Sequence, residues 1–214
     1  MLEVRRLSAG YGRARVLFDI DLEVRGGEVV ALLGRNGAGK STTLKAIMGL
    51  LPPSAGEVVF DGRDLRHLQP YEVARLGLGY VPEDRRIFTD LTVAENLEVG
   101  RQAPRGAAPA WTEERLFALF PALGALRERR GSRMSGGEQQ MLCIARTLAG
   151  NPAAILLDEP SEGLAPVVVE QVARAIIELK RAGVAVLLAE QSRQFTARVA
   201  DRTCMRETGI IRPA

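Results

Sequence analysis

The residues from Gly34 to Ser41 read GRNGAGKS and match G-x-x-x-x-G-K-[ST], a spacing suited to holding phosphate groups. Glycines let successive backbone N–H groups turn inward around a phosphate, Lys40 brings a positive charge, and the Ser41 hydroxyl can hold Mg²⁺. An apolar run, Val29–Leu33, precedes the motif, and Ser41–Gly49 follows it as a helix whose N-terminal dipole faces the anion. The alternative is a glycine-rich turn that carries a lysine by chance, which arises in roughly one chain in a hundred. We therefore predict a phosphate-binding loop.

Two adjacent carboxylates end a second apolar segment, Ala154–Glu159, which reads AILLDE. In a phosphate-transferring enzyme, Asp158 would reach Mg²⁺ through water, and Glu159 would orient and deprotonate an attacking water. The alternative is a core strand that ends in a solvated acidic turn. The phosphate loop upstream favours the catalytic interpretation.

A third motif, MSGGEQ, precedes a segment with helical periodicity. Leu142, Ala145 and Leu148 recur at helical spacing, so Ser135, Gly136 and the residue after them would open a helix. The backbone amides at such a helix end could clamp a phosphate. The alternative is an N-cap serine followed by flexible glycines.

Together these motifs resemble the ATP-binding-cassette ATPases in order and spacing, and the resemblance covers nearly the whole chain. It identifies Gly34–Ser41 with the family's Walker A loop, Ile155–Glu159 with its Walker B strand, and Ser135–Gln139 with its signature. Ser161–Leu164 resemble the loop that touches a partner subunit. The resemblance implies an α/β P-loop NTPase (RecA-like) fold, with a parallel-sheet core, an N-terminal antiparallel β lobe and an inserted α-helical subdomain.

The same resemblance implies which residues act on MgATP. Glu159, Gln191 and Lys40 would be catalytic, and Mg²⁺ would lie near Ser41, Asp158 and Glu83. The residues implied to bind ATP are Tyr11, which would stack on adenine, and Gly34, Arg35, Asn36, Gly37, Ala38, Gly39, Lys40, Ser41 and Thr42. The residues implied to close on ATP held by the opposite subunit are Ser135, Gly136, Gly137, Glu138 and Gln139.

Three further stretches resemble the ATPase subunits of branched-chain amino acid importers and their urea or amide relatives. They are GYVPEDRRIFTDLTVAENL (Gly79–Leu97), EPSEGLAP (Glu159–Pro166) and AEQS (Ala189–Ser192). This resemblance implies a second ATPase subunit, identical or not, and transmembrane permease subunits that dock near Glu83–Phe88, where Phe88 is either an apolar contact or a core residue. It implies a cytoplasmic protein, peripheral on the inner face of the cell membrane. The transported solute is not specified, because a cassette does not contact it.

The chain departs from most members of the family at two positions. Glu83 replaces a glutamine, and a carboxylate can approach Mg²⁺ but cannot donate a hydrogen bond. Gln191 stands where most members have a histidine, and it can donate to a γ-phosphate oxygen without carrying a proton. The only histidine, His67, is far from the motifs in sequence, so we expect it in a solvated loop.

The composition of the chain also argues against several classes of function. The 214 residues are 46% apolar, and the net charge is only +3 without a basic run interleaved with aromatic residues, which argues against nucleic-acid binding. No signal peptide or membrane-spanning stretch is evident, and we expect Arg127–Arg133 to be a solvated turn. Cys143 and Cys204 have neither paired nor metal-type spacing, so each is expected to be a reduced, packed residue.

The expected elements form one cassette domain spanning residues 1–214. Residues 1–90 and 150–214 would form the nucleotide-binding core with its β lobe, and residues 91–149 the helical subdomain. Strands are expected at Leu2–Leu7 and Val16–Val24, joined through the Gly10–Gly12 turn, and at Val29–Leu33, Gly79–Pro82, Ile155–Leu157 and Val184–Ala189. From Thr92 to Ala149 the pattern is almost wholly helical, with an amphipathic segment at Thr112–Phe120 and an irregular loop at Gly100–Ala110.

Three alternatives remain open from the sequence. One is an ATP-dependent dimerisation clamp with weak hydrolysis, suggested by Glu83 and Gln191. Another is a cassette that serves a different transport system or acts in nucleic-acid repair or translation, although zinc cysteines, coiled-coil insertions and a second cassette are missing. The third is a small-molecule kinase, which the signature-like Ser135–Gly137 disfavours.

Overall fold

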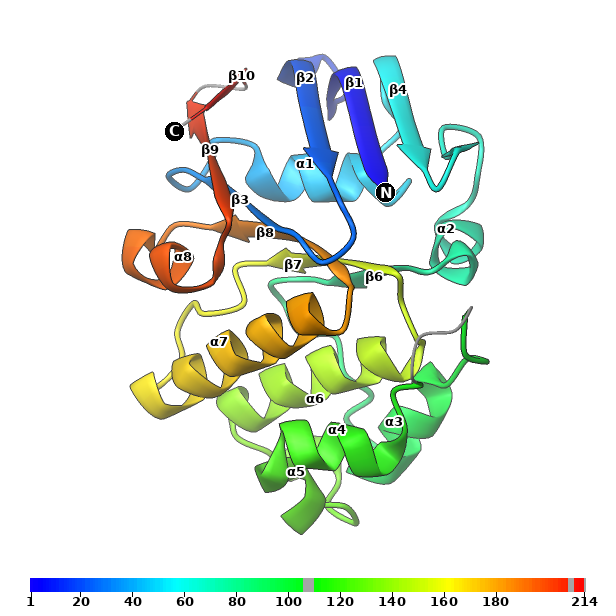
Figure 1. The fold of residues 1–214 in the computed structure, drawn as a ribbon, viewed down its shortest axis with the longest axis vertical. Helices are drawn as coiled ribbons and strands as arrows, with labels where there is room; N and C mark the ends of the chain where they lie inside the picture. Colours follow the sequence, from blue (N-terminus) through cyan, green and yellow to red (C-terminus); the bar gives the residue numbers. More distant parts are fainter. Residues whose placement is uncertain (106–109, 208–209, 214) are drawn as a thin grey trace.

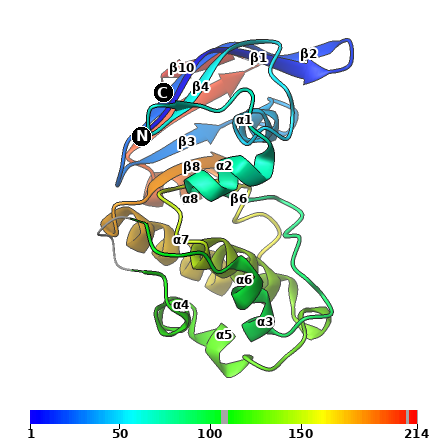
Figure 2. The ribbon, with the colours of Figure 1, turned by 90° about the vertical axis from the view of Figure 1, so that its right-hand side faces the viewer.

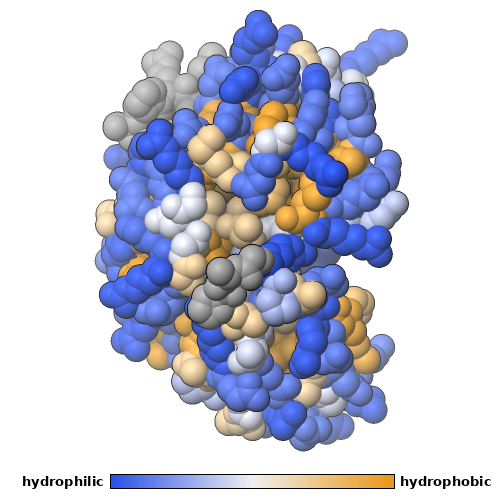
Figure 3. All heavy atoms as spheres, turned by 45° about the vertical axis from the view of Figure 1, so that its right-hand side comes forward, coloured by the Kyte–Doolittle hydropathy of each residue, from blue (hydrophilic) through white to orange (hydrophobic). Residues whose placement is uncertain are grey.

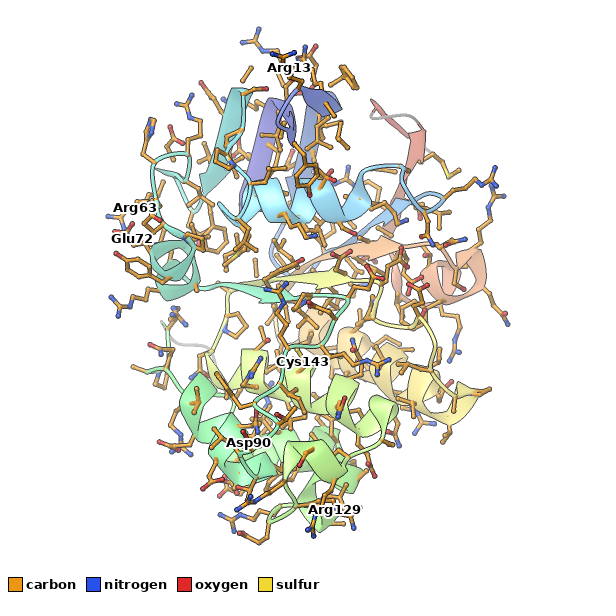
Figure 4. The ribbon with its side chains drawn as sticks, turned by 180° about the vertical axis from the view of Figure 1, so that it is seen from behind. Arg13, Arg63, Glu72, Asp90, Arg129 and Cys143 are labelled. Atoms are coloured by element: carbon orange, nitrogen blue, oxygen red, sulfur yellow. The ribbon has the colours of Figure 1, made fainter. Side chains whose placement is uncertain are left out.

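The computed structural model describes residues 1–105, 110–207 and 210–213. An antiparallel sheet forms one end of the molecule (Figure 1). Its strands lie in the order β2 (Ala14–Val24), β1 (Leu2–Tyr11), β4 (Ala55–Phe60) and β5 (Arg63–Asp64). The predicted β lobe is confirmed, but the predicted Gly10–Gly12 turn is misplaced, because Tyr11 is the last residue of β1 and still pairs with Ala14. Arg13 lies at the tip of this hairpin (Figure 4).

A second sheet crosses the middle of the molecule. Its order is β10 (Ile210–Pro213), β9 (Arg202–Glu207), β3 (Val29–Leu33), β8 (Ala185–Glu190), β7 (Ala154–Asp158) and β6 (Leu78–Val81). Neighbouring strands from β9 to β6 are parallel, and β10 pairs antiparallel with β9. Every residue of β3, β7 and β8 is buried, as expected for a parallel sheet covered on both faces.

Helices cover both faces of this sheet. The helix α1 (Lys40–Ile47) lies between the two sheets, and most of the others pack below the parallel sheet (Figures 1 and 2). The remaining helices are α2 (Pro70–Leu76), α3 (Val93–Gly100), α4 (Glu113–Leu119), α5 (Pro121–Ala125), α6 (Gly136–Ala149), α7 (Pro166–Arg181) and α8 (Arg193–Val199). The 3₁₀ turn is Gly131–Arg133.

The irregular loop predicted at Gly100–Ala110 is confirmed for residues 101–105 and 110, which lie outside helices, but Gly100 itself ends α3. The predicted amphipathic segment Thr112–Phe120 is helical from its second residue, because Thr112 is the N-cap of α4. The rest of the predicted loop, residues 106–109, lies outside the described residues. The solvated turn predicted at Arg127–Arg133 is exposed except for Gly131, which is buried. Within this turn, Arg129 lies at the opposite end of the molecule from Arg13 (Figure 4).

Two hydrophobic cores lie on opposite faces of the parallel sheet. Within β3, Val29 and Ala31 belong to the core shared with the helices, and Val30 and Leu32 to the core shared with the antiparallel sheet. The strands β7 and β8 alternate in the same way, because successive side chains of a strand point to opposite faces. Cys143 in α6 and Cys204 in β9 are buried and unpaired, as predicted. His67 is exposed in a turn, also as predicted.

Gly56 in β4 lies close to the backbone of the neighbouring strand β1. Its φ is +91°, and a Cβ there would lie 2.3 Å from the carbonyl oxygen of Arg6. We expect Gly56→Ala to lose about 1–2 kcal/mol through left-handed strain and about 1–3 kcal/mol more through overpacking. Chemical denaturation of the two purified proteins measures this loss of unfolding free energy.

Gly62 provides the matched control for this prediction. Its φ is +78°, but nothing lies within 4 Å of the position that a Cβ would occupy. Gly62→Ala should therefore lose only the strain contribution, about 1–2 kcal/mol. Equal losses in the two variants would show that the close approach to Arg6 has no energetic effect.

Candidate active site

The loops that follow β3, β7 and β8 meet at one edge of the parallel sheet, because these strands are neighbours and point the same way. Gly34 N–H donates to the carbonyl oxygen of Glu190 at 3.2 Å. Glu159 N–H donates to the carbonyl oxygen of Ala189 at 2.9 Å. Backbone pairing thus brings three chain segments, distant in sequence, to the same place.

The predicted phosphate loop connects β3 to α1. Gly37 and Gly39 have φ values of +81° and +89°, so the loop turns through conformations that favour glycine. The helix begins at Lys40 and ends at Ile47, close to the predicted Ser41–Gly49, and no side chain caps its N-terminus. Such a terminus leaves backbone N–H groups and the positive end of the helix dipole available to an anion.

Lys40 points back into this loop and is only 4% exposed. Its Nζ donates to the carbonyl oxygens of Gly34 at 2.8 Å and Arg35 at 3.1 Å. The same Nζ lies 2.9 Å from Oε1 of Glu159, which is also buried. Because each charge would be costly alone in this environment, the two groups stabilise one another.

Asp158 and Ser41 form the second part of the site. The Ser41 hydroxyl donates to Oδ1 of Asp158 at 2.8 Å, and the Tyr80 hydroxyl donates to Oδ2 at 3.2 Å. Burial raises the pKa of Asp158, although both hydrogen bonds act in the opposite direction. Burial and the neighbouring Asp158 raise the pKa of Tyr80, so its hydroxyl remains a donor.

Glu159 adopts a left-handed backbone conformation, with φ of +47°, directly after β7. Its Oε2 accepts a hydrogen bond from the backbone N–H of Gln191 at 3.1 Å. Burial raises the pKa of Glu159, and the nearby ammonium of Lys40 opposes this shift. The structure therefore brings together Lys40, Ser41, Asp158 and Glu159. Gln191 joins them through its backbone N–H, while its side chain is exposed.

The other predicted residues lie at the margins of this group. Tyr11 is 50% exposed at the end of β1, and Glu83 is exposed beyond β6, where its charge adds to the raised pKa of Asp158. In the described parts of the chain, no group of three or more His, Cys, Asp or Glu side chains could hold a metal ion. Arg35, Asn36 and Gly37 are exposed in the phosphate loop, Ala38 is half-buried, and Gly39 and Thr42 are buried.

The signature residues lie in the helical layer, at the start of α6. Ser135 is the N-cap, its Oγ accepting from the Glu138 N–H at 3.3 Å while the Glu138 carboxylate accepts from the Ser135 N–H at 2.6 Å. The predicted bare amides are thus partly paired, as in the N-cap alternative. Gln139 donates to backbone carbonyl oxygens before the helix, and the Val168 side chain lies close to Gly137, where a Cβ would be 2.8 Å from Cγ2.

An apolar groove of about 550 Å³, lined in part by Tyr80, lies on the side of the molecule shown in Figure 3. Its lining includes four of the large hydrophobic residues that remain exposed, namely Leu50 (49%), Tyr71 (58%), Phe88 (47%) and Val99 (54%). Phe88 is therefore not a core residue. The guanidinium of Arg146, from α6, lies 4.9 Å from the centre of the Phe88 ring.

Sequence comparison assigns the family. The profile of the ABC transporter family matches residues 17–162. This chain belongs to the ABC transporter family. One relative of this ABC ATPase is BraG of Pseudomonas aeruginosa, a high-affinity branched-chain amino acid transport ATP-binding protein, 41% identical over 99% of this chain and 91% of its own length. Another is LptB of Acidithiobacillus ferridurans, a lipopolysaccharide export system ATP-binding protein, 37% identical over 99% of this chain and 88% of its own.

Solved structures agree with the family assignment. An ATP-binding subunit of an ABC transporter superposes with a TM-score of 0.86 at 32% identity, over 99% of this chain and 88% of that one. The dimeric cassette MJ0796, bound to ADP and Pi in a post-hydrolysis state, superposes with a TM-score of 0.83 at 25% identity. This match covers 99% of this chain and 96% of that one. The predicted family, fold class and ATPase activity are confirmed. Within the described residues, no helix has the length and apolar character needed to span a bilayer.

Two residues in this region were missed by the sequence analysis. Tyr80 donates to Asp158 from the neighbouring strand β6, and Glu190 is buried at the end of β8. A tyrosine in a buried strand and a carboxylate directly before Gln191 were the available signals. Neither signal shows which residue the side chain bonds to, because that depends on which strands are neighbours in the sheet.

Proposed function

We propose that this ABC ATPase hydrolyses MgATP as one of a pair of cassettes and drives transport through membrane permease subunits. The observation that carries the proposal is the cluster of Lys40, Ser41, Asp158 and Glu159 at the ends of β3 and β7. A buried cation, an uncapped helix end and two carboxylates are the groups that phosphoryl transfer requires, since its catalysis rests on positioning and electrostatic stabilisation.

The nucleotide would lie along the phosphate loop and α1. Lys40 and the amides from Gly34 to Thr42 would hold the β- and γ-phosphates, and Tyr11 would stack on adenine. On this proposal, Lys40 exchanges its carbonyl contacts for phosphate oxygens. Its separation from Glu159 would free that carboxylate for the reaction.

The domain division is part of the proposal, with residues 1–90 and 150–214 forming the nucleotide-binding core and residues 91–149 the helical subdomain.

The residues beside this loop suit Mg²⁺. Ser41 Oγ and Asp158 Oδ1 are 2.8 Å apart, and oxygen ligands of this kind, together with phosphate oxygens, are what Mg²⁺ prefers. Ser41 and Asp158 would hold the ion, and Glu83, whose charge acts on Asp158, is proposed as a further contributor. Bound there, Mg²⁺ would neutralise charge that develops on the phosphate oxygens.

Hydrolysis would follow from the positions of Glu159 and Gln191. Glu159 would accept a proton from water as the water oxygen bonds to the γ-phosphorus and the bond to the β–γ bridging oxygen breaks. A raised pKa makes this carboxylate a stronger base at neutral pH. Gln191 would donate to a γ-phosphate oxygen as a neutral group.

A second subunit would complete each site. Ser135–Gln139 would close on the nucleotide held by the opposite chain, and Ser161–Leu164 would touch that chain. The dimeric state of the MJ0796 cassette supports this arrangement.

We further propose that a cytoplasmic segment of the permease fills the apolar groove at Phe88, which would keep the ATPase on the inner face of the membrane. Closure on ATP and opening after hydrolysis would move that segment.

The solute is proposed to be a branched-chain amino acid or a related small molecule, as for the relative BraG. LptB is nearly as similar, so the decisive experiment reconstitutes the chain with its copurified permease in proteoliposomes and measures ATP-dependent solute uptake and phosphate release. Movement of lipopolysaccharide, or of another solute class, would replace this part of the proposal. ATP-induced dimers without sustained phosphate release would support the clamp alternative.

A further inference from the structure

Glu190 is a buried charged residue to which the proposed mechanism assigns no role. It ends β8 and is only 1% exposed. A buried carboxylate is costly unless hydrogen bonds or an opposite charge compensate it. Its partners therefore indicate why a charge lies at this position.

Four hydrogen bonds converge on the Glu190 carboxylate from two loops. Oε1 accepts from the backbone N–H of Ser161 at 3.2 Å and from the Ser161 hydroxyl. Oε2 accepts from the backbone N–H groups of Gln191 at 2.9 Å and Ser192 at 3.0 Å. The Gln191 N–H is shared with Glu159, so the carboxylate links the loop after β7 to the loop after β8.

The chemistry of these partners requires an acceptor on both oxygens. Three of the four donors are backbone N–H groups, which cannot reverse their direction. A carboxylate only accepts, whereas a glutamine amide would direct its NH₂ group at one or more of these N–H groups in either orientation. Glu190→Gln thus removes hydrogen bonds with almost no change in volume.

The loop that carries Ser161 has an open outer side. A groove of about 630 Å³ borders it, lined by residues that include Glu159, Ser161, Glu190, Gln191 and Phe195. Because side chains do not enclose the loop on this side, the bonds to Glu190 contribute strongly to its position.

We propose that Glu190 is a positioning residue for ATP hydrolysis. Its carboxylate holds Ser161 and the backbone of Gln191 as one unit, so the loop facing the second subunit and the residue facing the γ-phosphate move together. The proposal rests on the proposed function, because it takes Ser161–Leu164 as the subunit contact and Gln191 as a neighbour of the γ-phosphate.

The test compares the full chain with Glu190→Gln and Glu190→Asp. For Glu190→Gln, we expect kcat to fall about 10- to 100-fold, the effect of one or two lost hydrogen bonds to a charged group. Titration with a fluorescent ATP analogue should give an unchanged Kd, since the phosphate loop is intact. Glu190→Asp keeps the charge and should retain an intermediate kcat. Glu178→Gln, an exposed carboxylate on α7, is the control and should leave kcat unchanged.

Ser161→Ala provides an independent measurement, because it removes one partner of Glu190 without altering the carboxylate. We expect kcat to fall roughly 10-fold in this variant. The Ser161→Ala/Glu190→Gln double variant should be no slower than Glu190→Gln alone, since the two changes break the same link. In a Glu159→Gln background, each change should also reduce the fraction of ATP-bound dimer measured by size-exclusion chromatography.

The outcomes separate the inference from the proposed function. An unchanged kcat in folded Glu190→Gln, or losses that multiply in the double variant, would overturn the positioning role. A parallel loss of nucleotide affinity and kcat would also overturn it, because it would indicate general damage to the fold. If Glu190→Gln does not fold, an unchanged kcat in Ser161→Ala overturns the inference. Failure of the unmodified chain to bind ATP would instead overturn the proposed function.

Discussion

Glu159→Gln should bind MgATP but hydrolyse it roughly 10²–10⁴-fold more slowly, the loss expected when general-base assistance is removed. Glutamine has nearly the same shape, and its carbonyl oxygen can still accept from the Gln191 N–H that lies 3.1 Å from Glu159. It cannot accept a proton from water. Binding and closure should therefore persist while the chemical step stalls, and ATP-bound dimers should accumulate.

Phosphate release under single-turnover conditions, together with size-exclusion chromatography, measures both effects. Glu178→Gln makes the same chemical change at an exposed position on α7 and should hydrolyse ATP at the normal rate. Near-normal turnover of Glu159→Gln would remove Glu159 from the role of general base.

Lys40→Ala should lose tight triphosphate binding, with Kd rising roughly 10²–10⁴-fold if two charge-assisted hydrogen bonds to phosphate are lost. The buried Nζ of Lys40 donates to the carbonyl oxygens of Gly34 and Arg35, inside the loop that is proposed to hold the phosphates. Equilibrium titration with a fluorescent ATP analogue measures the change. Lys180→Ala, which breaks a surface ion pair with Asp201, is the control and should bind normally.

The same substitution also affects folding, because it leaves Glu159 buried without its partner. Breaking a buried pair in this way costs about 3–5 kcal/mol of unfolding free energy. The double variant Lys40→Ala/Glu159→Gln should regain much of that stability, since no unpaired charge remains, yet still fail to bind ATP. Recovery of ATP binding in the double variant would show that lost stability, rather than lost phosphate contacts, explains the first result.

The parts of the site that could be predicted from the sequence are those built from neighbouring residues. The phosphate loop needs a buried strand, glycines in left-handed conformations and a helix start, and all three lie within a short stretch. Asp158 and Glu159 likewise follow directly from the strand that carries them. The capping box of Ser135 and Glu138 is also local, which is why the start of α6 was correctly placed.

Features that depend on strand order were missed. The strands β4 and β5 are short, and β4 is stabilised by pairing with β1, as in the register of Leu2 with Phe60. The strand predicted at Val184–Ala189 begins and ends one residue later in the structure, as β8. Because β8 ends at Glu190, this carboxylate belongs to the buried sheet. Pairing of distant segments decides these cases, and hydrophobic periodicity carries no information about which strands become neighbours.

The alternation of side chains in β3, β7 and β8 also has a consequence for cooperativity. Each of these strands contributes to both cores, so opening either face exposes apolar surface on the other. Their backbone amides should therefore exchange with deuterium only when the whole chain unfolds. The start of α6 borders the helical core alone and can open at lower free energy. The phosphate loop and the two carboxylates proposed to act in catalysis are thus attached to the slowest-exchanging part of the chain. The proposed signature is attached to a layer that can move against it.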